Sequence, residues 1–266
     1  MTLRTRRITI FGIILLNLTL LTISMTTLTA LAARLVKTPL QLFSGVLVML
    51  NSNPGLGYSL GASIIGTLLL VILSRYFRRN PSPETFLTMA AIGAIAVETI
   101  RTGFIILTIA KAPIIYYELL ARIIIFSQLF SITGLFFSSL YLLDIQYQKV
   151  NYIVLIQLIT ALLFAYILPV HTAHPVTLLQ HPVADSFGYP WLVGGIYACS
   201  ILNIMAVWGQ QKNLENWPLY SGAAMLSTGY ILHIILNGNW RLVGLSLLTI
   251  GAILFFWGQN KRYLWD

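Results

Sequence analysis

The sequence predicts an all-α integral membrane protein: a single polytopic domain, folded as a bundle of about eight transmembrane helices, with both termini in the cytoplasm. Of the 266 residues, 58% are hydrophobic and 9% are charged, whereas charged residues make up about a quarter of a soluble domain. The apolar residues gather in runs that approach or exceed the roughly 20 residues a helix needs to cross a bilayer. Basic residues lie at the ends of these runs, as in the loops of membrane proteins. The lipid bilayer is therefore the first expected partner.

The first predicted span, residues 8–33, follows a basic head at residues 1–7. A basic start, an apolar centre and the Ala-Leu-Ala at residues 30–32 are also typical of a secretory signal peptide with its cleavage site, and cleavage would leave seven spans. The apolar run is longer than the usual signal-peptide core, so we interpret it as an uncleaved anchor. Residues 39–50 are apolar but too short to cross, which predicts an interfacial or re-entrant segment.

The second predicted span, residues 55–77, contains Gly57 and Gly61 at a spacing that suits close helix packing. After it, Ser82 is placed to cap a helix whose first residue is Pro83. The remaining predicted spans are residues 84–110, 114–143, 152–168, 190–208, 218–236 and 240–257. Prolines fall at the ends of these spans and not inside them, so broken helices of the kind that bind substrates in many transporters are not predicted.

Basic residues predict the orientation of the bundle. One side of the eight-span arrangement holds ten of them, namely Arg4, Arg6, Arg7, Arg75, Arg78, Arg79, Lys149, Lys212, Lys261 and Arg262. The other side holds four: Arg34, Lys37, Lys111 and Arg241. Because cytoplasmic loops carry the excess of bases, we expect the first side and both termini to face the cytoplasm. We expect the membrane to be the plasma (inner) membrane.

Orientation also explains the formal charge of +9, so the basic composition gives no support for nucleic-acid binding. The single cysteine, Cys199, leaves no intrachain disulfide and no cysteine metal cluster.

Four ionisable side chains lie deep in the third and fourth predicted spans: Glu98, Arg101, Glu118 and Arg122. A rise of about 1.5 Å per residue from the turn at residues 111–113 places the arginines near the middle of a core about 30 Å thick. A lone charge there costs about 2.5 to 3.5 kcal/mol, so such residues face the bundle interior and pair. We expect each arginine to have a carboxylate on its own helix and another on the partner helix. The resulting neutral set is either a structural clasp or the floor of a ligand or ion site.

Histidines supply a second candidate site in the connection at residues 170–189. This connection contains His171, His174, His181 and Asp185, and imidazole nitrogens with a carboxylate are suitable ligands for zinc or another transition metal. Prolines directly follow His174 and His181 and bias them toward extended backbone. This pattern favours solvated, pH-responsive loop histidines over a metal site.

His233 lies near the far end of the seventh predicted span. Haem ligation would need a second intramembrane histidine, which the sequence lacks, so a packing or interfacial role fits better. The predicted topology places His233 and the 170–189 connection on the extracytoplasmic side, with the outer end of the charged helices. The sequence therefore predicts an outward-facing polar pocket, with Arg101, Glu118 and Arg122 as its floor and the connection as its lid. The five residues that we expect to bind a ligand in this pocket are Glu98, Arg101, Glu118, Arg122 and His233.

No motif in the sequence names a reaction or a cofactor. The zinc-protease, nucleophile-elbow, phosphate-loop and dinucleotide patterns are absent, and a carboxylate held ionised by an arginine is a poor general acid. We interpret the protein as a receptor-like sensor or the membrane subunit of a complex, which passes a signal to a partner protein. A secondary transporter or channel for a small polar or anionic solute is the alternative, and an intramembrane lipid-modifying enzyme is the third reading.

Overall fold

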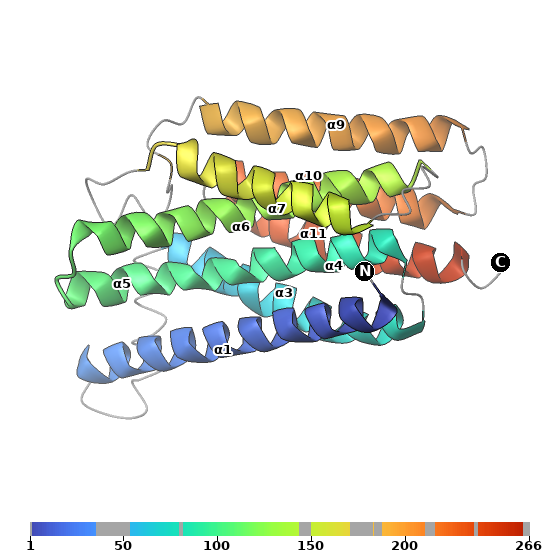
Figure 1. Ribbon diagram of the computed structural model, residues 1–266. Coiled ribbons are helices and arrows are strands. Elements are labelled where there is room, and N and C mark those ends of the chain that lie inside the picture. Colours follow the sequence, from blue (N-terminus) through green and yellow to red (C-terminus); the bar gives the residue numbers. More distant parts are fainter. Residues whose placement is uncertain are drawn as a thin grey trace.

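The computed structural model describes residues 2–35, 54–79, 82–143, 150–170, 183, 188–210, 216–236 and 239–262. Within these ranges the regular structure is helical, with one isolated antiparallel bridge between Val170 and Val183. The helices in chain order are α1 (Leu3–Leu35), α3 (Pro54–Arg79), α4 (Pro83–Ala96), η1 (Val97–Arg101), α5 (Thr102–Ile109), α6 (Ile114–Tyr141), α7 (Val150–Ile167), α9 (Gly188–Gln210), α10 (Trp217–Ile235) and α11 (Asn239–Arg262) (Figure 1). The interfacial segment predicted at residues 39–50 lies outside the described residues.

The helices form one bundle of roughly aligned rods (Figure 1). α1 begins and α11 ends at the same end of the bundle, which we call the terminal end; the turn between α5 and α6 lies at the opposite end, which we call the turn end (Figure 1). α6 contacts α4, α7, α9 and α10 and is the most buried of the spanning helices. The core is therefore built around the second helix of the predicted charged pair.

Seven of the described helical rods are long and apolar enough to cross a membrane. This confirms the all-helical, multi-pass membrane class. Each of the eight predicted ranges overlaps one rod, but α10 is not among the seven. Small and polar side chains, including Ser227, Tyr230 and His233, reduce the hydropathy of α10. The prediction of eight crossings therefore depends on α10.

The third predicted span, residues 84–110, corresponds to a continuous helical rod over Pro83–Ile109 that is not uniformly α-helical. Ser82 caps it, accepting a hydrogen bond from the Thr85 amide at 3.3 Å, with Pro83 at the start of the helix. Both features confirm the sequence prediction. Halfway along, α4 gives way to the five-residue 3₁₀ segment η1 before α5 resumes. The expectation of an unbroken helix was wrong here, and 3₁₀ segments inside helices often mark a hinge or strain.

The closest helix packing joins α10 and α11 through glycines spaced seven residues apart. These are Gly222 and Gly229 on α10 and Gly244, Gly251 and Gly258 on α11. A Cβ on Gly251 would lie 2.6 Å from the Leu226 nitrogen, and one on Gly244 would lie 2.8 Å from the His233 nitrogen. Small residues let helix backbones approach this closely in membranes. The close packing predicted at Gly61 is not seen, because a Cβ there would make an ordinary contact with Leu245 at 3.6 Å.

Polar bonds join the mostly exposed α1 to the rest of the bundle. The Asn17 side chain donates to the Gly93 carbonyl at 3.0 Å, and the hydroxyls of Ser24 and Thr102 lie 2.7 Å apart. Hydrogen bonds between membrane helices contribute about 0.6 kcal/mol on average. α1 is thus tied to both α4 and α5.

Candidate functional site

Six buried side chains lie close together at the 3₁₀ segment η1, in the centre of the bundle. Glu98 and Arg101 come from η1, Gln128 from α6, Tyr189 from α9, and Tyr230 and His233 from α10. Each of the six is at most 7% exposed. We call these six residues the Glu98 cluster.

The Glu98 carboxylate has partners on both oxygens. Its Oε2 lies 3.6 Å from Arg101 Nε and 3.3 Å from His233 Nε2, while its Oε1 accepts a hydrogen bond from Gln128 Nε2 at 2.9 Å. A buried charge is tolerated only when opposite charges and hydrogen bonds compensate for its lost hydration. One guanidinium, one imidazole and one amide supply that compensation.

Hydrogen bonds extend from the carboxylate to α9 and α10. The Tyr189 hydroxyl donates to Gln128 Oε1 at 2.6 Å, and the Tyr230 hydroxyl donates to the Gln128 main-chain carbonyl at 3.2 Å. Gln128 is therefore the middle of a chain that runs from Tyr189 to Glu98. Buried networks of this kind are rigid when every member is satisfied and costly when one member is lost.

The local helix geometry explains why Glu98 and Arg101 share a side. With three residues per turn in a 3₁₀ helix, side chains at i and i+3 eclipse each other. Both residues lie in η1, three positions apart. The change from α to 3₁₀ geometry thus aligns the acid and the base toward the bundle interior.

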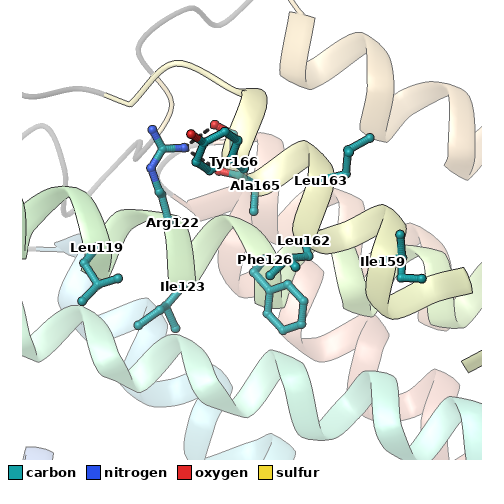
Figure 2. Close-up of a pocket in the computed structure, with 9 residues that line it drawn as sticks. All are labelled: Leu119, Arg122, Ile123, Phe126, Ile159, Leu162, Leu163, Ala165 and Tyr166. Atoms are coloured by element: carbon teal, nitrogen blue, oxygen red, sulfur yellow. Dashed lines mark hydrogen bonds between the residues drawn. The ribbon is translucent and has the colours of Figure 1, made fainter. Parts of the chain in front are cut away.

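Glu118 and Arg122 form a second, separate pair on α6. Glu118 Oε1 accepts hydrogen bonds from Arg122 Nη2 at 2.6 Å and Nε at 3.0 Å, and the Arg122 and Glu118 side chains are 27% and 33% exposed. Arg122 also donates to the carbonyls of Ala165 and Tyr166 at the end of α7, and its guanidinium lies 5.3 Å from the centre of the Tyr166 ring (Figure 2). Carbonyls in the last turn of a helix lack intrahelical donors. Arg122 therefore acts as a cap that holds α7 against α6.

The four predicted charges thus lie in two different surroundings. The sequence predicted that each arginine also meets an acid on the partner helix; the contacts observed instead bring His233 to Glu98 and the last turn of α7 to Arg122. Arg122 and Gln128 are six residues apart on α6, so their directions around the helix differ by about 120°. Depth along a helix was predictable, but direction around it was not.

His233 on α10 contacts Glu98 on η1. The sequence predicted a ligand-binding role for His233. Its Nε2 faces Glu98, and its Nδ1 is buried with no hydrogen-bond partner among the described residues. The second ring nitrogen can therefore form a further hydrogen bond without breaking an existing contact.

The predicted metal-binding residues, His171, His174, His181 and Asp185, lie outside the described residues. Among the residues that the structure does describe, no three His, Cys, Asp or Glu side chains are grouped to hold a metal ion. Val170 and Val183 of this connection form the isolated bridge, and Val183 is buried against the main core.

Sequence reasoning missed Gln128, Tyr189 and Tyr230. A signal for Gln128 was present, because it lies as many residues after Pro113 as Glu98 lies before it. Residues equidistant from the turn of a helical hairpin lie at equal depth. No comparable signal marked Tyr189 or Tyr230, which reach the cluster from helices much later in the chain.

A groove of about 570 Å³ opens between α6 and α7 on the outside of the bundle. Its walls are apolar, with Phe126, Ile159 and Leu162 among them, and Arg122 lies at one end (Figure 2). Of the five predicted ligand-binding residues, Arg122 lines this groove, whereas Glu98, Arg101 and His233 are packed in the core.

No protein-family model, curated protein or solved structure matches this chain. Within the described residues, seven helices are long and apolar enough to cross a membrane, which identifies a polytopic integral membrane protein. Its more specific role is proposed below from the geometry of the Glu98 cluster.

Proposed function

We propose that this protein is a receptor-like sensor, or the membrane subunit of a signalling complex, and that the Glu98 cluster is its switch. The observation that carries the proposal is the hydrogen-bond chain from Tyr189 through Gln128 to Glu98. The chain begins in the first turn of α9, next to the connection predicted to face the outside, and it ends at the 3₁₀ segment within α4–α5.

The hydrogen-bond chain supports sensing because each of its hydrogen bonds depends on the next one. A solute that binds at the turn end and takes the Tyr189 hydroxyl would leave Gln128 Oε1 without its donor. An unsatisfied buried polar group costs about 1 to 3 kcal/mol, which is enough to shift a two-state equilibrium by about five- to 150-fold. η1 is the natural hinge for such a shift, because a 3₁₀ stretch inside a helix often marks a hinge.

The signal would leave the bundle through helices that are open to a partner. α1, α7 and α9 are the least buried of the seven spanning helices. α9 carries Tyr189 itself, so a change in the cluster moves a helix whose outer face is available. We propose that a partner protein docks on these helices within the membrane.

A fluorescent label on the single cysteine tests the sensor proposal. Cys199 is exposed on α9, and an environment-sensitive dye there reports movement of that helix. We expect a solute from a panel of small polar and anionic compounds to change the fluorescence in nanodiscs and to raise stability by about 2.7 kcal/mol at 100 times its Kd. Tyr189→Phe should abolish the fluorescence response.

Tyr197→Phe is the matched control, because Tyr197 also lies on α9 but pairs with Thr228 outside the cluster, at 3.1 Å. If the fluorescence response is as large in Tyr189→Phe as in Tyr197→Phe, the hydrogen-bond chain is not the switch.

A transporter is the second candidate, and η1 is the observation that favours it. Interrupted helices with ionisable groups near the midplane are common at transport sites, and η1 brings Glu98 and His233 together there. Solute accumulation in proteoliposomes, driven by a proton gradient and lost in Glu98→Gln, would favour transport. Fluorescence change without accumulation would favour sensing.

A further inference from the structure

A second groove, of about 480 Å³, lies between α3 and α11 near the terminal end of the bundle. α3 and α11 run in the same direction and end at the same end of the bundle (Figure 1). Ile65, Leu69 and Ile72 form one wall and Ile253 belongs to the other. Because helices rise about 1.5 Å per residue, the wall from Ile65 to Tyr76 spans about 16 Å, close to one leaflet of a core about 30 Å thick.

The character of the groove changes at the terminal end. There Tyr76, Trp257 and Asn260 line it, and amphipathic aromatic residues are typical of the level of the lipid headgroups. The groove is therefore lined mostly by apolar side chains along the depth of an acyl chain, with Thr249 at its inner end. It is polar where that acyl chain would meet its glycerol and phosphate.

Two exposed bases flank this polar mouth. Lys261 follows Trp257 by one helical turn, and its ammonium group lies 5.6 Å from the centre of the Trp257 ring. Arg75 follows Ile72 by three residues and is exposed on the same side of α3. Neither α3 nor α11 contains an aspartate or glutamate. The mouth is thus positively charged, with no acid on its two helices to neutralise it.

We infer that the groove between α3 and α11 is a binding site for one anionic phospholipid of the leaflet at the terminal end. An acyl chain fills the apolar wall, and the phosphate lies between Arg75 and Lys261. Each base near the membrane surface strengthens attraction to anionic lipid by roughly fivefold. The groove holds the chain in register with the bases, so binding selects the headgroup charge.

Native mass spectrometry of the whole protein tests the inference with phosphatidylglycerol and phosphatidylcholine of identical acyl chains. We expect the wild type to retain phosphatidylglycerol in preference. The double variant Arg75→Gln/Lys261→Gln should retain it roughly 25-fold less well and should retain phosphatidylcholine as before. Lys111→Gln, which removes a base at the turn end, is the matched control and should behave as the wild type.

Three outcomes overturn the inference: equal retention of the two lipids by the wild type, unchanged preference in the double variant, or an equal loss in Lys111→Gln. A groove-filling variant, Leu69→Trp, separates this site from general attraction to a basic surface. It should reduce retention of phosphatidylglycerol although every charge is kept, and undiminished retention would also overturn the inference.

Discussion

Two glutamate–arginine pairs lie on consecutive helices of this protein, and their surroundings could hardly differ more. Glu98 and Arg101 are 3% exposed, and Glu98 also contacts His233 on α10 and Gln128 on α6. Glu118 and Arg122 are about a third exposed and hold the end of a neighbouring helix. The same two residue types, one helical turn apart, therefore make a buried network in one place and an exposed cap in the other. What differs is the direction in which each pair faces, because direction decides how much hydration each charge loses.

The largest effect should come from breaking the buried pair. Arg101→Ala leaves the Glu98 carboxylate without its guanidinium, and removal of one member of a buried ion pair costs about 3 to 5 kcal/mol. Unfolding of the protein in bicelles by added denaturing detergent measures the loss. Adding Glu98→Gln to Arg101→Ala should recover much of it, because the neutral amide removes the unpaired charge; a double variant no more stable than Arg101→Ala would contradict this account.

A smaller loss of stability should follow from separating α10, which carries His233, from α11. Gly244→Val places a side chain against the His233 main chain, where even a Cβ would lie 2.8 Å from the nitrogen. Overpacking costs about 1 to 3 kcal/mol, and α10 must move away from α11. Gly195→Val is the matched control, because a Cβ there meets nothing within 4 Å. Equal stability of the two variants in the same unfolding assay would show that the glycine interface does not support the buried pair.

A comparable loss of stability is expected when the hydrogen-bond chain is broken at Gln128. This loss should be recognisable by its non-additivity with a second change in the same hydrogen-bond chain. Gln128→Leu removes the donor to Glu98 and the acceptor of Tyr189 at once, which costs about 1 to 3 kcal/mol. Because the two residues are in contact, Gln128→Leu and Tyr189→Phe should be non-additive in a double-mutant cycle. The same cycle between Gln128→Leu and Glu118→Gln should be additive, and strong coupling there would mean that the two glutamate–arginine pairs communicate.

The exposed pair should give the smallest effect. Arg122→Gln removes the cap on the Ala165 and Tyr166 carbonyls, and hydrogen bonds between membrane helices contribute about 0.6 kcal/mol each, up to about 1.7. We expect a total loss of about 1 to 2 kcal/mol. A loss as large as that of Arg101→Ala would remove the distinction between the two pairs.

The residue ranges of the helices were predictable, because a run of apolar side chains is visible in the local sequence. In lipid such a run forms a helix, since a helix makes its backbone hydrogen bonds within its own segment. The cap at Ser82 followed from the same local chemistry. The depth of Gln128 beside Glu98 was also present in the spacing around Pro113, although it was not used. The glycines of α10 and α11 are visible as a repeat of seven, but the repeat does not say which helix they face.

What the sequence by itself determined is the membrane class and the ranges of the helices, and the depth of each charge stays a prediction, since all three follow from composition and from the rise of a helix. Only the tertiary structure decided that His233, 135 residues after Glu98, meets that carboxylate, and that Arg122 turns toward α7. Rotation of a helix about its axis is set by packing against every neighbour at once. A hundred degrees per residue turns a small change of register into a different partner, so contacts around the helix could be found only from the assembled bundle.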